Sequence, residues 1–254
     1  MVKLSDRLQI MADRIEPSKT MADIGTDHGF LPIYLVENKK CTKVIMADIS
    51  EPSLDKARAN AQECSAECQL AFEFRAGDGL KVIEQDEVEA VAVAGMGGKL
   101  IRDIMAENMD VTCSVDKYVL QPRIGQGHLR KWLCANNFNI ICEDLVIEGD
   151  YIPEIITVET VLSETPSKVM SIYEKYKNEM KNCDGDHMIW RVPPWITIAS
   201  GPVDDFLHRA ISRETDKLKN VMRAKTRKLA LESQIRSDIK YLKRLLKEYN
   251  DGIY

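Results

Sequence analysis

Five short apolar stretches, each followed by a helical pattern, constrain the fold of this chain more than any other feature. Each stretch is nearly continuous in apolar residues, which is typical of a strand buried on both sides. Strands of this kind separated by helices indicate a parallel sheet with helices on both faces. The expected strands are residues 19–25, 42–49, 70–78, 88–95 and 116–122, and the expected helices are 30–39, 51–65, 79–85, 97–109 and 125–136.

The pattern changes after residue 137. Residues 138–160 contain two strand-like runs joined by the turn Glu148-Gly149-Asp150, which indicates a hairpin and therefore an antiparallel pair at the edge of the sheet. Five strand-and-helix units followed by a hairpin are typical of the seven-stranded, Rossmann-like sheet of class I methyltransferases. The sequence therefore predicts an α/β domain of this kind over residues 1–162.

Residues 163–254 are expected to form a second, α-helical domain. Val169 to Met180 fit one amphipathic helix, and residues 182–202 read as a long irregular connection. From Val203 to Asn250 there is no glycine or proline, and apolar residues recur every three or four positions, as in a coiled coil. A single helix of that length would reach roughly 70 Å. We therefore expect a helical hairpin that folds back between Arg223 and Ser233, where the apolar pattern weakens.

Composition narrows the class of protein. No window approaches 18 consecutive apolar residues, so no membrane partner is expected. The N-terminal segment has charges between helically spaced apolar residues and lacks the features of a secretory signal, which predicts a cytoplasmic protein. The seven cysteines form no C-x-x-C pair, so neither a metal site nor a disulfide framework is expected. Nothing in the sequence indicates an obligate protein partner.

Charge is distributed unevenly along the chain. Residues 206–254 carry 13 Lys and Arg against 6 Asp and Glu, a net charge of +7, whereas the whole chain has −5, which leaves −12 for the remainder. A cationic arm on an acidic body is compatible with a polyanionic partner. A solvated helix face rich in Lys and Arg explains the same run, and the sequence leaves both interpretations open.

The first expected strand ends in the pattern Asp23-x-Gly25-x-x-x-Gly29, directly before a helix. Glycines at such a turn let the backbone approach a ligand closely, near the N–H groups that begin the helix. A dinucleotide site favours G-x-G-x-x-G, whereas here Asp27 lies between the glycines. A carboxylate there would repel a pyrophosphate but suits a cationic ligand such as S-adenosylmethionine, which carries a sulfonium and an ammonium group.

Acidic residues also end the second and third expected strands. Asp48, followed by Ile49, stands where an acid can accept hydrogen bonds from the hydroxyls of an adenosine ribose. Asp78, followed by Gly79, can accept from the amino group of the cofactor's adenine. Each aspartate alone is compatible with a helix cap. Their succession at the carboxyl ends of consecutive strands predicts a cofactor site, because open α/β sheets bind ligands at that edge.

The fourth expected strand ends in Gly95-Met96-Gly97-Gly98. Methyltransferases that act on exocyclic amino groups usually show an Asn- or Asp-Pro-Pro-aromatic motif here, and that motif is absent. The glycines suggest backbone packed against the substrate, and a tight strand-to-helix turn explains them equally well.

These motifs together resemble one family. The stretches "DIGTDHGFLPIYL", "RAGDGL", "AGMGG" and "LQPRIGQGHLRKWL" look like the TrmK family of bacterial tRNA (adenine-N1)-methyltransferases, with a match over residues 4–160 and a similar helical tail. The resemblance implies methylation of N1 of adenine 22 in tRNA, with S-adenosyl-L-methionine as cofactor. Phe30 departs from the family, which often has tyrosine there, so a hydroxyl is lost while an aromatic face remains.

The chemistry of that reaction fits the missing amine motif. Adenine N1 carries an in-plane lone pair, so no proton has to be removed before attack, and orientation and electrostatics are expected to supply most of the rate. The candidates for the methyl-transfer site are Asp27, His28, Phe30 and Met96, with a structural role for His28 left open. Near the fifth strand, the candidates for contacting RNA phosphates or closing the pocket are Gln121, Arg123 and Arg130. In the tail, the candidates for contacting RNA are Arg223, Lys225, Arg227 and Lys228. Two alternatives remain, a methyltransferase of another substrate and a non-catalytic RNA-binding module that retains the pocket.

Overall fold

The computed structural model describes residues 2–160, 166–224 and 228–253. Within these ranges one seven-stranded sheet runs through the molecule in the order β3-β2-β1-β4-β5-β7-β6. Strand β7 is antiparallel to both β5 and β6, and the other paired neighbours are parallel. The strands are β1 (Ser18–Ile24), β2 (Cys41–Asp48), β3 (Phe72–Ala76), β4 (Ala90–Gly97), β5 (Lys117–Ile124), β6 (Asn139–Leu145) and β7 (Glu154–Glu159). The predicted sheet and its terminal hairpin are confirmed.

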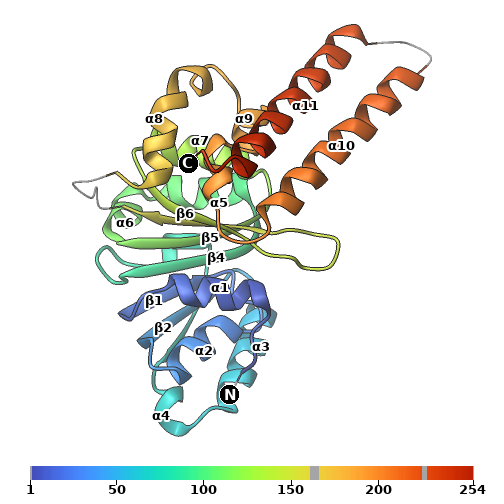
Figure 1. Ribbon diagram of the computed structural model, residues 1–254. Coiled ribbons are helices and arrows are strands. Elements are labelled where there is room, and N and C mark those ends of the chain that lie inside the picture. Colours follow the sequence, from blue (N-terminus) through green and yellow to red (C-terminus); the bar gives the residue numbers. More distant parts are fainter. Residues whose placement is uncertain (1, 161–165, 225–227, 254) are drawn as a thin grey trace.

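Helices cover both faces of this sheet (Figure 1). Along β4, Ala90 and Ala92 join the core on one face, while Val91 and Val93 join the core on the other. This alternation of two apolar sets explains why the strands read as continuous apolar runs. One face packs against α1 (Asp6–Arg14), α2 (Phe30–Glu37) and α3 (Glu51–Gln62); the other packs against η1 (Gly79–Val82), α5 (Gly98–Glu107), α6 (Met109–Ser114), α7 (Gln126–Ala135) and α8 (Lys168–Met180). The short helix α4 (Ala66–Gln69) precedes β3.

Capping residues in the sequence predict where most helices begin, but the helix expected at residues 97–109 is divided in two. Ser50 caps α3 by accepting from the backbone N–H of Ser53 at 3.4 Å, as the sequence predicts. The helix expected at 97–109 instead ends at Glu107, and α6 begins at Met109. Asn108 leaves the helical conformation, and its side chain accepts from Val111 N, so it caps the second helix.

The connection before the C-terminal helices is more ordered than the sequence suggests. Residues 182–202 contain α9 (Met188–Arg191) and the short helix η2 (Pro194–Ile198), and Trp190 and Trp195 are buried in the same core as α7. The indole N–H of Trp195 donates to Glu143 Oε1 of β6 at 2.7 Å. The expectation of an irregular connection is therefore wrong for these residues, because the two tryptophans pack inward.

The C-terminal helices α10 (Val203–Arg223) and α11 (Leu229–Asn250) form the predicted hairpin. They lie side by side and project away from the sheet, so that the end of α10 and the start of α11 are farthest from it (Figure 1). Phe206, Leu207 and Leu242 anchor the base of the hairpin by packing against Leu145 and Ile196. None of the helices in the described part of the chain has the length and apolar content needed to cross a bilayer.

The domain division at residue 162 falls among residues outside the described ranges. Val169, Ile172 and Tyr173 of α8 pack in the same core as the sheet residues Tyr118 and Ile140. Helix α8 is thus continuous with the core of the sheet, whereas α10 and α11 contribute to a separate apolar cluster. The division itself stays a prediction.

Candidate active site at the carboxyl edge of the sheet

The predicted cofactor and methyl-transfer residues follow neighbouring strands at one edge of the sheet. In the register of the sheet Ile24 pairs with Ala47 and with Val93, and Asp48 pairs with Ala76, so the carboxyl ends of β3, β2, β1 and β4 lie next to one another. The residues brought to this edge are Asp23, Gly25, Asp27, His28, Gly29, Phe30, Asp48, Ile49, Asp78, Gly79, Gly95 and Met96.

The loop between β1 and α2 requires both of its glycines. Gly25 has φ +81°, and a Cβ added there would overlap the Cε of Met96. Gly29 has φ +68°, and its Cβ would lie 3.2 Å from the Cβ of Ala57. Both backbone angles disfavour any residue with a side chain. The loop therefore passes close to Met96 on one side and to α3 on the other.

Asp23, at the end of β1, is buried with its carboxyl group close to the second acid of the edge. Burial is the main cause that raises the pKa of Asp23 to about 6, and the charge of Asp48 adds to the rise. A buried carboxyl group next to another carboxylate favours a cation. The acidic pair therefore suits a positively charged ligand.

Asp48 and Asp78 end β2 and β3 with different surroundings. Asp48 is half-buried, and its Oδ1 accepts from Ser50 N at 2.7 Å, so the aspartate braces the start of α3. Ile49 next to it is 76% exposed, which leaves an apolar surface at the edge. Asp78 is exposed and forms an ion pair with Lys81 at 2.8 Å.

Asp27, His28 and Phe30 form an exposed cluster. Asp27 contacts Lys56 Nζ at 2.8 Å through one oxygen and His28 Nε2 at 3.2 Å through the other. The hydrogen bond from Lys56 is the first cause that lowers the pKa of Asp27. The rings of His28 and Phe30 are stacked, with centroids 5.2 Å apart and planes inclined by 10°. The edge thus presents a carboxylate beside two aromatic faces.

Helix α3 supports this cluster through Lys56 and Asn60, two residues that the sequence analysis did not identify. Lys56 pairs with Asp27, and the Nδ2 of Asn60 donates to the carbonyl oxygen of His28 at 2.8 Å. Lys56 and Asn60 are four residues apart, so they share one face of the helix. Two polar residues at that spacing on the helix after the second strand were the available signal.

Gln121 of β5 closes the edge from the other side. Its Oε1 accepts from the backbone N–H of Gly95 at 3.1 Å and from Arg7 Nη1 at 3.2 Å. The pairing of β4 with β5 is irregular around Met96, and this acceptor holds the irregular segment. Gln121 is 2% exposed, so contact with RNA phosphates, one of the two roles expected for it, is wrong, and closing the pocket stays a prediction.

The arginine and lysine candidates for RNA contact differ in exposure. Arg123 is exposed at the end of β5, and Arg223 and Lys228 are exposed near the turn of the hairpin. Lys225 and Arg227 lie outside the described residues. Arg130 has no exposed surface, since its guanidinium is held by Glu143 at 2.5 Å, by Glu154 and by the carbonyl oxygens of Trp190 and Arg191. The prediction that Arg130 contacts RNA is therefore wrong.

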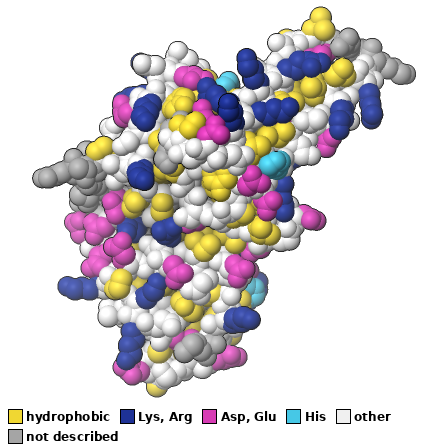
Figure 2. Space-filling model, in the orientation of Figure 1, with side chains coloured by type: hydrophobic (Ala, Val, Ile, Leu, Met, Phe, Trp, Pro, Cys, Tyr) yellow, Lys and Arg dark blue, Asp and Glu magenta, His cyan; other side chains and the backbone are white. Residues whose placement is uncertain are grey.

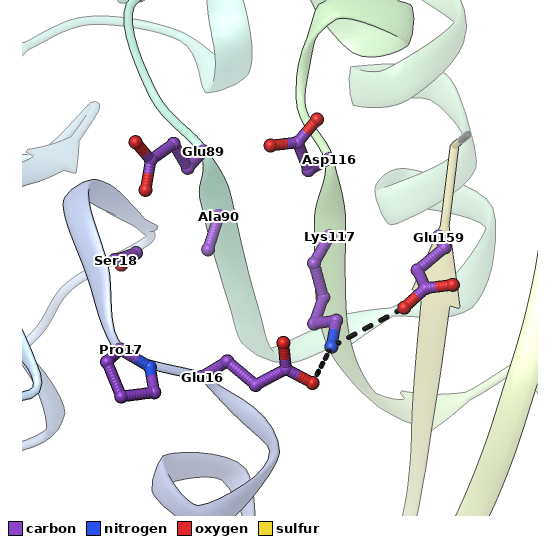
Figure 3. Close-up of a pocket in the computed structure, with 8 residues that line it drawn as sticks. All are labelled: Glu16, Pro17, Ser18, Glu89, Ala90, Asp116, Lys117 and Glu159. Carbon is purple, nitrogen blue, oxygen red and sulfur yellow. Dashed lines mark hydrogen bonds and ion pairs between the residues drawn. The ribbon is translucent and has the colours of Figure 1, made fainter.

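Among the clefts that the described residues line, two lie at the edges of the sheet, outside the loop residues just described. One, of about 290 Å³, opens at the opposite edge, where the strands begin, and Lys117 there bridges Glu16 at 2.6 Å and Glu159 at 3.5 Å (Figure 3). The other, of about 520 Å³, lies beside the carboxyl end of β5, between the β6–β7 connection and α10. Only the second adjoins the carboxyl edge.

Comparisons with known proteins agree with this geometry. A family described as "Methyltransferase domain" matches residues 4–156. The tRNA (adenine(22)-N(1))-methyltransferase of Bacillus subtilis (strain 168) is 35% identical over 158 residues, which are 62% of this chain and 66% of that protein. A putative tRNA methyltransferase of Mycoplasma pneumoniae is 26% identical over 187 residues, 72% of this chain and 80% of the relative.

A solved structure extends the similarity to the C-terminal helices. The crystal structure of the B. subtilis m1A22 tRNA methyltransferase TrmK has a TM-score of 0.78 and 25% identity, with 97% of this chain and 100% of that chain covered. The family match spans more than half of the chain and includes every strand from β1 to β6. With the sheet order and the acidic carboxyl edge described above, this chain belongs to the methyltransferase-domain family.

Proposed function

We propose that this protein is an S-adenosyl-L-methionine-dependent enzyme that methylates N1 of adenine 22 in tRNA. The observation that carries the proposal is the carboxyl edge, where a cation-compatible acidic pair lies beside the exposed cluster of Asp27, His28 and Phe30. The B. subtilis relative, 35% identical, is named for this reaction. Because the aligned segment covers 66% of that relative, the activity and the substrate enter here as proposals.

The residues of the edge fit the cofactor. Gly25 leaves the turn without a side chain of its own, and the side chain that lies over it is the flexible Met96. Asp23 and Asp48 supply negative charge for the ammonium group and hydrogen-bond acceptors for the ribose hydroxyls. Exposed Ile49 offers an apolar face for the cofactor's adenine, with Asp78 and Gly79 on the neighbouring loop. The cofactor supplies a methyl group on a sulfonium, which an attacking nitrogen accepts directly.

The protein's own residues then have to orient the target base. Adenine N1 attacks with its lone pair and becomes cationic, so no general base is required, and a nearby carboxylate favours the product. Asp27, kept ionised by Lys56, is the candidate for this electrostatic role. Phe30 is 39% exposed and stacked on His28. Its ring offers a surface on which the target adenine can lie after that base has left its paired position in the RNA. Met96, packed over Gly25, limits the space at the methyl group.

The proposal is tested by incubating the full chain with S-adenosyl-L-methionine and two transcripts of one tRNA. One transcript carries adenine at position 22 and the matched control carries guanine there. Mass spectrometry of the digested RNA should show 1-methyladenosine only in the first. No methyl group on either transcript would refute the proposed function, and methylation of both would refute the target position.

Replacing Asp48 with Ala tests the cofactor site separately. We expect at least a tenfold weaker affinity for S-adenosyl-L-methionine, because an acceptor for the ribose is lost, while the sheet stays folded. Isothermal titration calorimetry measures the affinity, and circular dichroism checks the fold. An unchanged affinity would mean that Asp48 serves only to brace Ser50.

A further inference from the structure

The 520 Å³ groove beside β5 is lined by four arginines from three different elements. Arg123 comes from β5, Arg191 from α9, and Arg209 and Arg213 from α10. The last two are four residues apart, so they project from the same face of α10 about one turn apart. Segments distant in sequence therefore converge to place positive charge along one groove.

Most acidic residues of this groove are already engaged. Glu154 is paired with the buried Arg130, and Asp216 is paired with Lys219 at 2.9 Å. Arg191 is held at 3.3 Å by Glu214, in the middle of α10. Among the residues that the structure describes, Arg123, Arg209 and Arg213 have no ion-pair partner. Among the described residues that line the groove, three guanidinium groups without an ion pair thus stand against one carboxylate without an ion pair, that of Asp150, which leaves the groove cationic.

The groove adjoins the candidate active site. It includes Gly125, and a Cβ added at Gly98 would lie 2.5 Å from the carbonyl oxygen of Gly125, so the loops after β4 and β5 touch. The turn of the hairpin, where Arg223 ends α10, lies far from this edge, since 21 helical residues extend about 30 Å. Figure 2 shows Lys and Arg side chains along the projecting hairpin, so the arginines at its base are only part of its positive charge.

From this geometry we infer that the groove binds the phosphodiester backbone of the RNA strand next to the target nucleotide, with Arg209 and Arg213 as its principal phosphate contacts. The inference rests on the proposed function and adds to it the surface that holds the substrate. Guanidinium groups suit phosphate oxygens because they donate two hydrogen bonds in one plane. Tyr151, 43% exposed and lining the same groove, adds an aromatic face on which a flanking base can stack. The hairpin then contributes to binding chiefly through its base.

The test compares two pairs of substitutions that remove equal charge from the same hairpin. The groove variant is Arg209→Ala with Arg213→Ala, and the matched control is Arg223→Ala with Lys228→Ala at the far end. Affinity for an unmodified tRNA transcript is measured by fluorescence anisotropy at several KCl concentrations with the full chain. We expect the groove variant to bind at least tenfold more weakly and to lose about 1.4 from the slope of log K against log salt, the value for two phosphates of a single strand. The control should change both quantities less.

Further measurements separate the possible outcomes. Affinity for S-adenosyl-L-methionine should be unchanged in both variants, which shows that the cofactor site is intact. If the groove variant does not fold, the single substitution Arg213→Gln on the exposed face of α10 should give about half the change in slope. If the wild-type protein methylates tRNA and the groove variant binds tRNA as tightly as the control variant does, this inference is overturned and the proposed function stands. Polyglutamate that binds in an arginine-dependent way while tRNA does not would identify an acidic peptide as the occupant and also overturn it.

Discussion

The protonation state of Asp23 affects both the stability of the fold and the binding of a ligand. Its ordinary pKa is 3.8, and in the folded chain it rises to about 6. Between pH values equal to these two pKa values, the folded chain holds a proton that the unfolded chain has released. The free energy of unfolding therefore falls as the pH rises through this window, and it has fallen by its full amount above about pH 6. This decrease in the free energy of unfolding is about 3 kcal/mol at neutral pH.

The substitution Asp23→Asn should therefore raise the free energy of unfolding by about 2 to 3 kcal/mol at pH 8, with little change near pH 3.5. Urea unfolding at the two pH values measures the difference. In the wild-type protein the positive cofactor favours ionised Asp23, so affinity for S-adenosyl-L-methionine should increase as the pH rises through about 6. The Asn variant should bind weakly and without that dependence. A flat pH profile in the wild-type protein would contradict the assignment of Asp23 to the cofactor.

Gln121 holds the backbone at the proposed methyl-transfer site, although its own side chain is buried. Replacing it with Leu leaves the N–H of Gly95 without its acceptor, which costs about 1 to 3 kcal/mol. Replacing it with Glu keeps an oxygen for both Gly95 and Arg7 and should cost less. Thermal unfolding and kcat for tRNA should rank the proteins as wild type, Glu and Leu. Equal values for the two variants would argue against this acceptor as the support of Met96.

At the scale of elements, strands were easier to predict than connections. The apolar runs that become β1 to β5 follow from burial on both faces, which depends on the strand itself. The two short helices in residues 182–202 depend on Trp190 and Trp195 finding room against α7 and β6, and no local pattern carries that information. The break at Asn108 is different, because asparagine favours the N-cap position and its side chain accepts from the backbone N–H of Val111 only three residues later, so the signal is local.

Arg130 illustrates a signal that was available and missed. Leu129, Leu133 and Cys134 of α7 are buried, and Arg130 lies on the same stripe four residues before Cys134. A charge on a buried stripe needs a partner in the core, and Glu143 and Glu154 lie at buried positions of the terminal hairpin. Which acids meet the arginine depends on the register of β6 and β7, which the sequence alone does not specify.

Breaking this buried network should loosen several elements together. Arg130→Ala leaves two buried carboxylates without their cation, so we expect a loss of 3 to 5 kcal/mol in the free energy of unfolding, about the range seen for broken buried ion pairs. Arg123→Ala, at an exposed position nearby, is the control and should change stability by about 0.5 kcal/mol or less. Guanidinium chloride unfolding measures both. Similar stabilities for the two variants would mean that the network is replaced by water or by neighbouring groups.

On the scale of the whole molecule, the C-terminal hairpin is both an appendage and part of the packed structure. Phe206, Leu207 and Leu242 at its base cover Leu145, Ile152 and Ile196, which belong to the sheet side and to η2. Near the far end, the described apolar side chains of Met222, Leu229 and Leu231 are exposed. Sequence periodicity predicts the two helices, but it does not show that their first and last turns complete an apolar cluster.

Two deletions should therefore behave differently. Removing residues 203–254 exposes this cluster and should give a destabilised, aggregation-prone protein, whereas replacing residues 221–231 by a short glycine linker should leave the fold and the affinity for S-adenosyl-L-methionine unchanged. Size-exclusion chromatography and calorimetry test both. A soluble, monomeric protein after the long deletion, with full cofactor affinity, would contradict the role given to the base of the hairpin.

The placement of the tryptophans gives the protein an internal optical reporter. Trp132, Trp190 and Trp195 are the three tryptophans of the chain, and all pack around α7, α9 and η2, on the side where the hairpin is anchored. The loops after β1, β2 and β3 contain none. Intrinsic fluorescence should therefore be nearly insensitive to a ligand at those loops, while any movement of the hairpin base should change the emission without an added label.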